Sequence, residues 1–235
     1  MPDLEKKVIV SADDFGRSPE ANANILELLS LKKLQRISVM VNGKFSPEEI
    51  NSLINSQIKI DLHLNFLSLL ENNQTWRKKT GVLSRLLFFF RDYLTGKISA
   101  PGAAQTWMEQ LEKFHTIFGR YPDGLNSHEH VHFFPPYFKI ILTLAQKSKT
   151  TYLRFGKKDF IEATNIVSLI IFFLKKINRR RFLASGLASA DFWVSLDWLE
   201  KDTLQKIKNL PSGEIELIVH PERAAELEFL KTRRL

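Results

Sequence analysis

Hydrophobic and polar positions divide the chain into short β-branched runs and longer segments with helical spacing. The short runs predict strands at Lys7–Ser11, Ile37–Val41, Ile58–Leu62, Gly124–Ser127, Thr151–Phe155 and Glu214–Val219. Apolar residues at helical spacing predict helices over 84–94, 104–118, 136–147, 163–177, 197–209 and 222–232. Strands and helices therefore alternate along most of the sequence.

Two further helices are indicated by their start signals. Ser18-Pro19-Glu20 and Ser46-Pro47-Glu48 each place a serine N-cap before a proline in the first turn. Glu49 lies three residues after Ser46, the spacing of a capping box. We therefore expect each of these helices to follow one of the first two strands.

This alternation with short connections favours an α/β fold with a mostly parallel sheet. Six or more such units could close into a barrel or leave an open sheet. The sequence has no internal repeat, no low-complexity tract and no linker rich in proline, glycine and serine. A single domain spanning residues 1–235 is the simplest prediction.

Composition excludes several classes of site. The chain of 235 residues has no cysteine, so disulfides, thiolate zinc sites, iron–sulfur clusters and cysteine nucleophiles are excluded. No dinucleotide-binding glycine motif, phosphate-binding loop or nucleophile elbow is found. The N-terminus lacks a secretory signal and no segment has about 18 consecutive apolar residues. We expect a cytoplasmic protein, with association with a membrane left open.

Positive charge is concentrated in one window. Residues 147–181 contain ten basic and two acidic residues, which equals the net charge of +8 of the whole chain. One local basic surface is expected. It could let a non-catalytic protein bind a membrane surface or another anionic partner. Nucleic acid is not expected, because Phe172 and Phe173 lie in an apolar run rather than between basic residues.

Part of this window combines charge with an apolar run. The segment 165–174 reads NIVSLIIFFL and is followed by five basic residues within 175–181. A second phenylalanine-rich stretch covers Val82–Leu94. The simpler interpretation is two buried helices beside a solvated basic turn. The alternative is a surface that rests on an anionic membrane.

Residues able to do chemistry follow several predicted strands. Asp13 and Asp14 follow the first strand, His63 the third and His220 the last. His128, His130 and His132 follow the strand at 124–127, and an extended stretch would point all three rings to one side. Carboxyl ends of parallel strands share one edge, where sites are built. These residues are therefore expected to meet there.

Two imidazoles and one carboxylate would leave open positions on a divalent metal ion. A bound metal can lower the pKa of water toward about 7, a second carboxylate can take a proton, and a further histidine can protonate a leaving amine. An iron(II) oxygenase uses the same ligand types, but would leave a carboxylate and a histidine without a task. Each residue could also be structural.

Four blocks resemble the YdjC-like (ChbG/HpnK-type) carbohydrate deacetylases over nearly the whole chain. The family's N-A-D-D-F-G start is matched at 11–16, its G-x-H-x-x-L-T block at 61–67, its L-D-S-H-x-H-V-H-x-x-P block at 125–135, and its E-x-x-x-H-P end at 216–221. Among the departures from these patterns, Asp61 replaces the usual glycine, Leu67 the threonine and Asn126 the aspartate. Asn126 removes a carboxylate that could orient a neighbouring residue.

The resemblance implies an irregular (β/α) barrel of the NodB/YdjC type and hydrolysis of an N-acetyl group from an amino sugar, either an oligosaccharide or a lipid-linked sugar. One divalent ion, Mg²⁺ or Zn²⁺, is implied. A peripheral contact with an anionic membrane and a homodimer are left open. The resemblance assigns these roles: metal ligands Asp14, His63 and His128; general base Asp13; general acid His220; substrate-binding or supporting residues His130, His132, Asn126 and Arg154.

Overall fold

The computed structural model describes residues 6–66, 91, 95, 99–159, 166–199, 205, 209 and 212–233. Its strands are β1 (Lys7–Phe15), β2 (Arg36–Val39), β3 (Lys59–Leu64), β4 (Gly124–Ser127), β5 (Tyr152–Leu153), β6 (Phe192–Ser195) and β7 (Glu214–Val219). Its α-helices are α1 (Pro19–Ser30), α2 (Pro47–Asn55), α6 (Ala100–Phe118), α7 (Pro135–Ser148), α8 (Ile166–Ser185) and α10 (Ala224–Thr232). Two short 3₁₀ segments, His128–Phe133 and Leu196–Trp198, follow β4 and β6.

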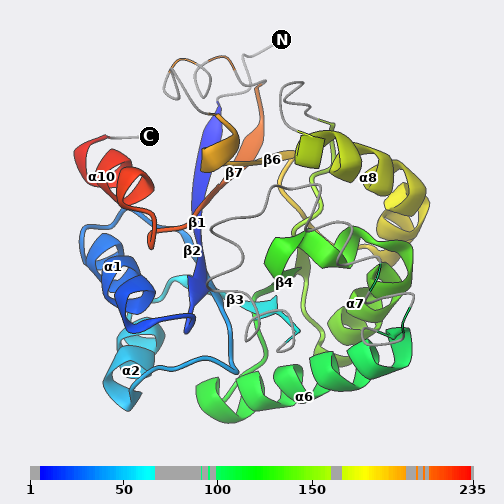
Figure 1. The fold of residues 1–235 in the computed structure, drawn as a ribbon, viewed down its shortest axis with the longest axis horizontal. Coiled ribbons are helices and arrows are strands. Elements are labelled where there is room, and N and C mark those ends of the chain that lie inside the picture. The colour runs from blue at the N-terminus through cyan, green and yellow to red at the C-terminus, as the bar shows by residue number, and fades with distance from the viewer. Residues whose placement is uncertain are drawn as a thin grey trace.

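The strands form one parallel sheet that curls on itself. The strand order is β5-β4-β3-β2-β1-β7-β6, so β5 and β6 occupy the two edges. Tyr152 of β5 bridges to Ala188, which lies in the segment leading into β6. The backbone N–H of Ala188 donates to the carbonyl of Thr151 at 2.8 Å. The expected irregular (β/α) barrel is confirmed, and the helices surround the curled sheet (Figure 1).

Most predicted elements are found close to their expected positions. Ser18 caps α1, and Ser46 and Glu49 form the predicted capping box of α2. β6 was not predicted. α8 continues through the basic run to Ser185, eight residues beyond the predicted end. Most of the predicted helices at 84–94 and 197–209, with Val82–Leu94, lies outside the described residues, as does Leu67.

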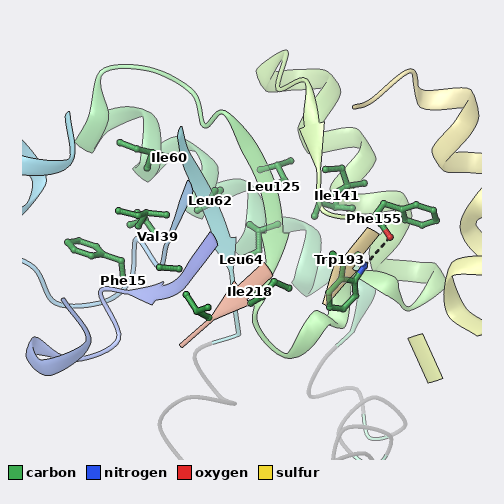
Figure 2. Packing of buried hydrophobic residues seen from close by; sticks show 14 of the residues in the cluster. Phe15, Val39, Ile60, Leu62, Leu64, Leu125, Ile141, Phe155, Trp193 and Ile218 are labelled. Atoms are coloured by element: carbon green, nitrogen blue, oxygen red, sulfur yellow. Dashed lines mark hydrogen bonds between the residues drawn. The ribbon is translucent and has the colours of Figure 1, made fainter. Parts of the chain in front are cut away.

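Side chains alternate between two chemically different faces of the sheet. Ile60, Leu62 and Leu64 of β3 are buried in the hydrophobic cluster that includes residues of the surrounding helices, and Figure 2 shows them packed beside neighbouring strands. Asp61 and His63 point to the opposite face, because successive side chains of a strand alternate. The helices therefore cover an apolar outer face, and the inner face is polar.

Ion pairs neutralise the charges on this inner face. Arg36 Nε donates to Asp61 Oδ2 at 2.8 Å, and the Arg36 guanidinium lies 3.9 Å from the centroid of the Tyr152 ring. Tyr152 donates its hydroxyl to Glu216 Oε2 at 2.6 Å. Asp61, at the family's glycine position, is thus accommodated by a buried arginine. Burial raises the pKa of Asp61, and the positive charge of Arg36 opposes that rise.

Two of the basic residues in the window 147–181 are buried, so not all of its charge lies on the predicted basic surface. Arg154 is fully buried inside the barrel. Lys175 is also buried and forms an ion pair with Asp159 at 3.3 Å. Counting charges along the sequence missed this, because an arginine or lysine can be buried wherever a carboxylate meets it. No helix in the described part of the chain has both the length and the hydropathy needed to cross a bilayer.

Candidate active site

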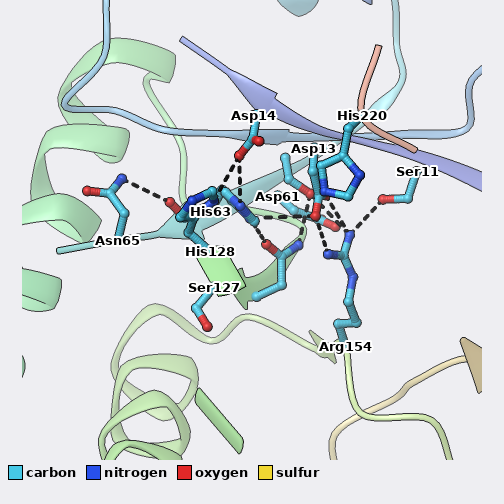
Figure 3. A network of polar contacts seen from close by, with 12 residues as sticks. Ser11, Asp13, Asp14, Asp61, His63, Asn65, Ser127, His128, Arg154 and His220 are labelled. Atoms are coloured by element: carbon cyan, nitrogen blue, oxygen red, sulfur yellow. Dashed lines mark hydrogen bonds and ion pairs between the residues drawn. The ribbon is translucent and has the colours of Figure 1, made fainter. Parts of the chain in front are cut away.

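The carboxyl ends of five strands bring the predicted residues together. Asp13 and Asp14 lie on β1 and His63 on β3, while His128 directly follows β4. Arg154 directly follows β5, and His220 directly follows β7. Figure 3 shows all six of these side chains converging on one region. The expectation that these residues meet at one edge of the sheet is therefore confirmed.

A β-bulge lets two consecutive aspartates reach this region. Between Ala12 and Phe15 the register of β1 against β2 gains one residue. Asp14 lies within this bulge at a φ of 71°, a conformation that non-glycine residues rarely adopt. Asp13 keeps its side chain on the inner face, and Asp14 turns toward His63 and His128. A regular strand would have placed the two carboxylates on opposite faces.

Asp14, His63 and His128 form a compact ligand cluster. Asp14 Oδ1 lies 3.2 Å from His63 Nε2 and 3.1 Å from His128 Nδ1. One donor atom from each residue lies within 4.8 Å of the other two, so the group could hold a metal ion. Burial lowers the pKa of His128, which favours the neutral imidazole that metals require. The side chain of His128 keeps 11% exposure, which leaves the cluster accessible.

Asn126 orients His63 in the way a metal-ligating histidine requires. The two residues are register partners on β3 and β4. His63 Nδ1 forms a short hydrogen bond with Asn126 Oδ1, and Asn126 Nδ2 donates to Ser38 Oγ at 2.9 Å. Because the amide oxygen only accepts, the Nδ1 atom carries the proton and Nε2 keeps its lone pair for a metal. The amide thus supplies the orientation that the sequence suggested was lost with the aspartate.

Arg154 fixes the carboxylate of Asp13 in position. Its guanidinium donates to both oxygens of Asp13, from Nη1 at 2.6 Å and from Nη2 at 2.8 Å. Nε donates to Glu216 Oε1 at 2.8 Å and Nη2 to Ser11 Oγ at 2.9 Å. Burial raises the pKa of Asp13, but the charge of Arg154 outweighs it and holds that pKa well below its usual range. Asp13 is therefore ionised and fixed in position.

His220 lies beside Asp13 (Figure 3) and is supported by a carboxylate of α10. Its backbone N–H donates to Glu226 Oε2 at 2.7 Å, and its Nδ1 lies 3.8 Å from the same oxygen. Burial lowers the pKa of His220, but the carboxylates of Glu226 and Asp14 outweigh that effect and raise it. The imidazole therefore tends to keep its second proton, as a general acid requires.

The histidine run is not extended, so the condition under which its three rings would share one side is not met. Glu129 and His130 adopt φ values of 51° and 56° within a 3₁₀ segment, which breaks the alternation. His132 is fully buried, its Nε2–H donates to the carbonyl of Arg154 at 3.0 Å, and its Nδ1 accepts from Ser127 Oγ. Burial lowers the pKa of His132 to about 3, so it is a neutral support. His130 packs against Trp193 at 4.7 Å between ring centroids.

Several supporting residues were given no role by sequence reasoning. Glu216 lies in the E-x-x-x-H-P block, and an acid placed between apolar residues of the strand EIELIV was the available signal. Ser38, in an apolar strand, gave a similar signal. Glu226 and Trp193 gave none, because a glutamate in the first turn of a helix and a tryptophan in a short strand are both common.

Comparisons with known proteins find carbohydrate deacetylases among the relatives of this chain. The chain is 27% identical over 151 residues to a chitooligosaccharide deacetylase from Serratia marcescens, covering 61% of this chain and 57% of the relative. It is 27% identical over 135 residues to a carbohydrate deacetylase from Mus musculus, covering 55% of this chain and 44% of the relative. The chain thus spans about half the length of these curated relatives.

A solved structure shares the fold. It is a protein from Enterococcus faecalis V583 described as a cellobiose-phosphate cleavage protein, with a TM-score of 0.57 and 19% identity over 92% of this chain and 80% of that chain. The family model of YdjC-like proteins matches residues 7–234. By this match, which covers nearly the whole sequence, the chain belongs to the YdjC-like protein family.

Proposed function

We propose that this chain is a metal-dependent deacetylase that removes the acetyl group from the nitrogen of an amino sugar and releases acetate. The observation that carries the proposal is the grouping of Asp14, His63 and His128 at the carboxyl ends of the strands. A second carboxylate, Asp13, and a further histidine, His220, lie beside them. The names of the curated relatives, carbohydrate deacetylase and chitooligosaccharide deacetylase, support the substrate class.

The donor set fits a divalent cation. Asp14 would supply a carboxylate oxygen, and His63 and His128 would supply neutral imidazole nitrogens. Two imidazoles favour Zn²⁺ over Mg²⁺, because Mg²⁺ prefers oxygen ligands. When bound, such an ion polarises a carbonyl group and makes water more acidic. The hydrogen bond from His63 to Asn126 supports this assignment, because ligating histidines nearly always donate their other N–H to an oxygen acceptor.

Asp13 would act as the general base. In the net reaction, water adds to the acetyl carbon, the C–N bond breaks, and acetate and a free amine are formed. Asp13 is ionised and can accept a proton from the attacking water. Arg154 holds both of its oxygens, so the carboxylate cannot rotate away from the site. This constraint reduces the basicity of Asp13 and fixes its position.

His220 would act as the general acid. An amine is a poor leaving group until its nitrogen receives a proton, and a protonated imidazole can supply one. The raised pKa of His220 favours the protonated ring. Its side chain is 15% exposed, so a substrate can reach it. An oxygenase with the same ligand set would give neither His220 nor Asp13 a task, which favours hydrolysis.

Acetate release from a panel of sugars tests this proposal. The purified protein is loaded with Zn²⁺ or Mg²⁺ and incubated with N-acetylglucosamine, its oligomers and other N-acetylated amino sugars. Acetate and free amine are then measured in equal amounts if the reaction is deacetylation. Absence of acetate from every sugar, with metal stoichiometrically bound, would contradict the proposed activity.

Metal content tests the ligand assignment separately. Asp14→Ala, His63→Ala and His128→Ala should each remove most of the bound metal, because a site with three protein ligands is strongly weakened by losing one. His115→Ala is the matched control, since His115 lies on α6 with its ring 4.6 Å from Tyr121. Full metal occupancy in His63→Ala would show that the ligand set is wrong.

A further inference from the structure

Exposed apolar side chains are concentrated on α8. Six large apolar residues are strongly exposed in the described part of the chain, and four of them belong to this helix. Ile166 is 49% exposed, Phe173 62%, Ile177 56% and Leu183 65%. Scattered exposed apolar residues are common on soluble proteins, but a group on one element marks an interaction surface.

Three of these residues share one side of the helix. Phe173 and Ile177 follow Ile166 by seven and eleven residues, which correspond to about two and three helical turns. The opposite side of α8 is buried against the protein through Ile171, Lys175, Asn178 and Phe182. The exposed apolar residues are therefore not the ones that pack α8 into the core, because the opposite side of the helix makes those contacts.

Basic residues flank this exposed side. Lys176, Arg180 and Arg181 are exposed, and α8 contains no aspartate or glutamate. Arg180 and Arg181 form no ion pair within the described part of the chain, whereas Arg179 reaches the carbonyl of Lys157 at 3.3 Å. α8 lies at the periphery of the barrel beside α7, on the side away from α1 and α10 (Figure 1). We name Ile166, Phe173, Lys176, Ile177, Arg180 and Arg181 the α8 face.

We propose that the α8 face binds the surface of a membrane that contains anionic lipids. The cations would contact the phosphate headgroups, and Ile166, Phe173 and Ile177 would enter the boundary between headgroups and acyl chains. This is how an amphipathic helix with a basic, apolar-backed surface lies on a bilayer. The protein would be peripheral, because α8 does not span the bilayer.

Charge argues for lipid over a second copy of the chain. Two copies of the α8 face would bring cations together without any carboxylate from either helix. Single-stranded nucleic acid is disfavoured, because Phe173 is the only aromatic residue of the α8 face and stacking platforms need several. An anionic bilayer can bind both the cations and the apolar side chains of the α8 face, because its negatively charged headgroups lie directly above an apolar layer.

Vesicle co-sedimentation tests the proposal and does not depend on the deacetylase activity. The protein is mixed with vesicles of phosphatidylcholine alone, or of phosphatidylcholine and phosphatidylglycerol in equal amounts, at low and high salt. We expect binding only to the anionic vesicles and a large loss of binding at high salt, because salt screens exposed charges. No binding at low salt, or equal binding to neutral vesicles, would overturn the proposal.

Two matched pairs of variants assign the binding to the α8 face. Arg180→Ser combined with Arg181→Ser should weaken binding about thirtyfold, or about fivefold per cation. Lys44→Ser combined with Lys113→Ser removes two exposed cations elsewhere and should leave binding near that of the wild type. If both double variants lose binding equally, the attraction comes from net charge and the α8 face is not the site.

The apolar part is tested in the same way. Phe173→Ser should weaken binding about tenfold, whereas Ile54→Ser, which removes a 45% exposed side chain from α2, should not. In Phe173→Trp, the added tryptophan emission should shift to shorter wavelength with anionic vesicles only. Sedimentation velocity without lipid is the final check: self-association that Phe173→Ser abolishes would assign the face to a dimer instead and refute the proposal.

Discussion

Replacing Asn126 by leucine should weaken metal binding, although Asn126 is not itself one of the proposed metal ligands. Asn126 is fully buried between His63 Nδ1, which donates to its amide oxygen, and Ser38 Oγ, which accepts from its amide nitrogen. Leucine has a similar size and shape but no polar atoms. The imidazole of His63 then loses the bond that fixes its tautomer and its rotation.

The size of the effect follows from what the bond does. Loss of an outer partner of a ligating histidine lowers metal affinity by about 10- to 100-fold, which equals about 1.4–2.8 kcal/mol. The metal-free protein should also lose about 1–3 kcal/mol of unfolding free energy, because a buried N–H is left without an acceptor. Asn126→Asp restores an acceptor for His63, so its metal affinity should equal or exceed that of the wild type.

Competition with a chromophoric chelator at fixed pH measures the affinity, and chemical denaturation measures the stability. Asn178→Leu is the matched control, since Asn178 is a fully buried asparagine that donates to the carbonyls of Phe133 and Leu174. It should lose stability and keep metal affinity. Unchanged affinity in Asn126→Leu would refute either the orienting bond or the role of His63 as a ligand.

Three further predictions concern the other charged groups. Asp13→Asn should retain metal, by metal analysis, while turnover falls by about 10²–10⁴-fold, the usual loss for acid–base catalysis. Arg36→Met should lower unfolding free energy by about 3–5 kcal/mol in denaturant titrations, because Asp61 is left as an unpaired buried charge, and adding Asp61→Leu should recover most of it. Glu226→Gln should move the alkaline limb of the kcat profile to lower pH, since the carboxylate raises the pKa of His220 and the active protonated ring is lost as pH rises through that pKa.

The sequence alone determined the fold class and the edge where the site lies. Short β-branched runs alternate with segments of helical spacing, and this order of elements favours an α/β fold with a mostly parallel sheet. Because parallel strands place their carboxyl ends at one edge, residues such as His63 and His220 could be expected to meet although they are far apart in the chain.

Only the tertiary structure decided how those residues are used. The bulge that turns Asp14 away from Asp13 is an extra residue in a strand pairing, and no local pattern encodes the register of β1 against β2. The left-handed residues Glu129 and His130 redirected a histidine run that alternation would have kept on one side. Arg154 counts toward the basic window in the sequence, but in the fold Asp13 and Glu216, from two other strands, form ion pairs with it inside the barrel. Burial of a charge depends on partners distant in sequence, and composition cannot report where they lie.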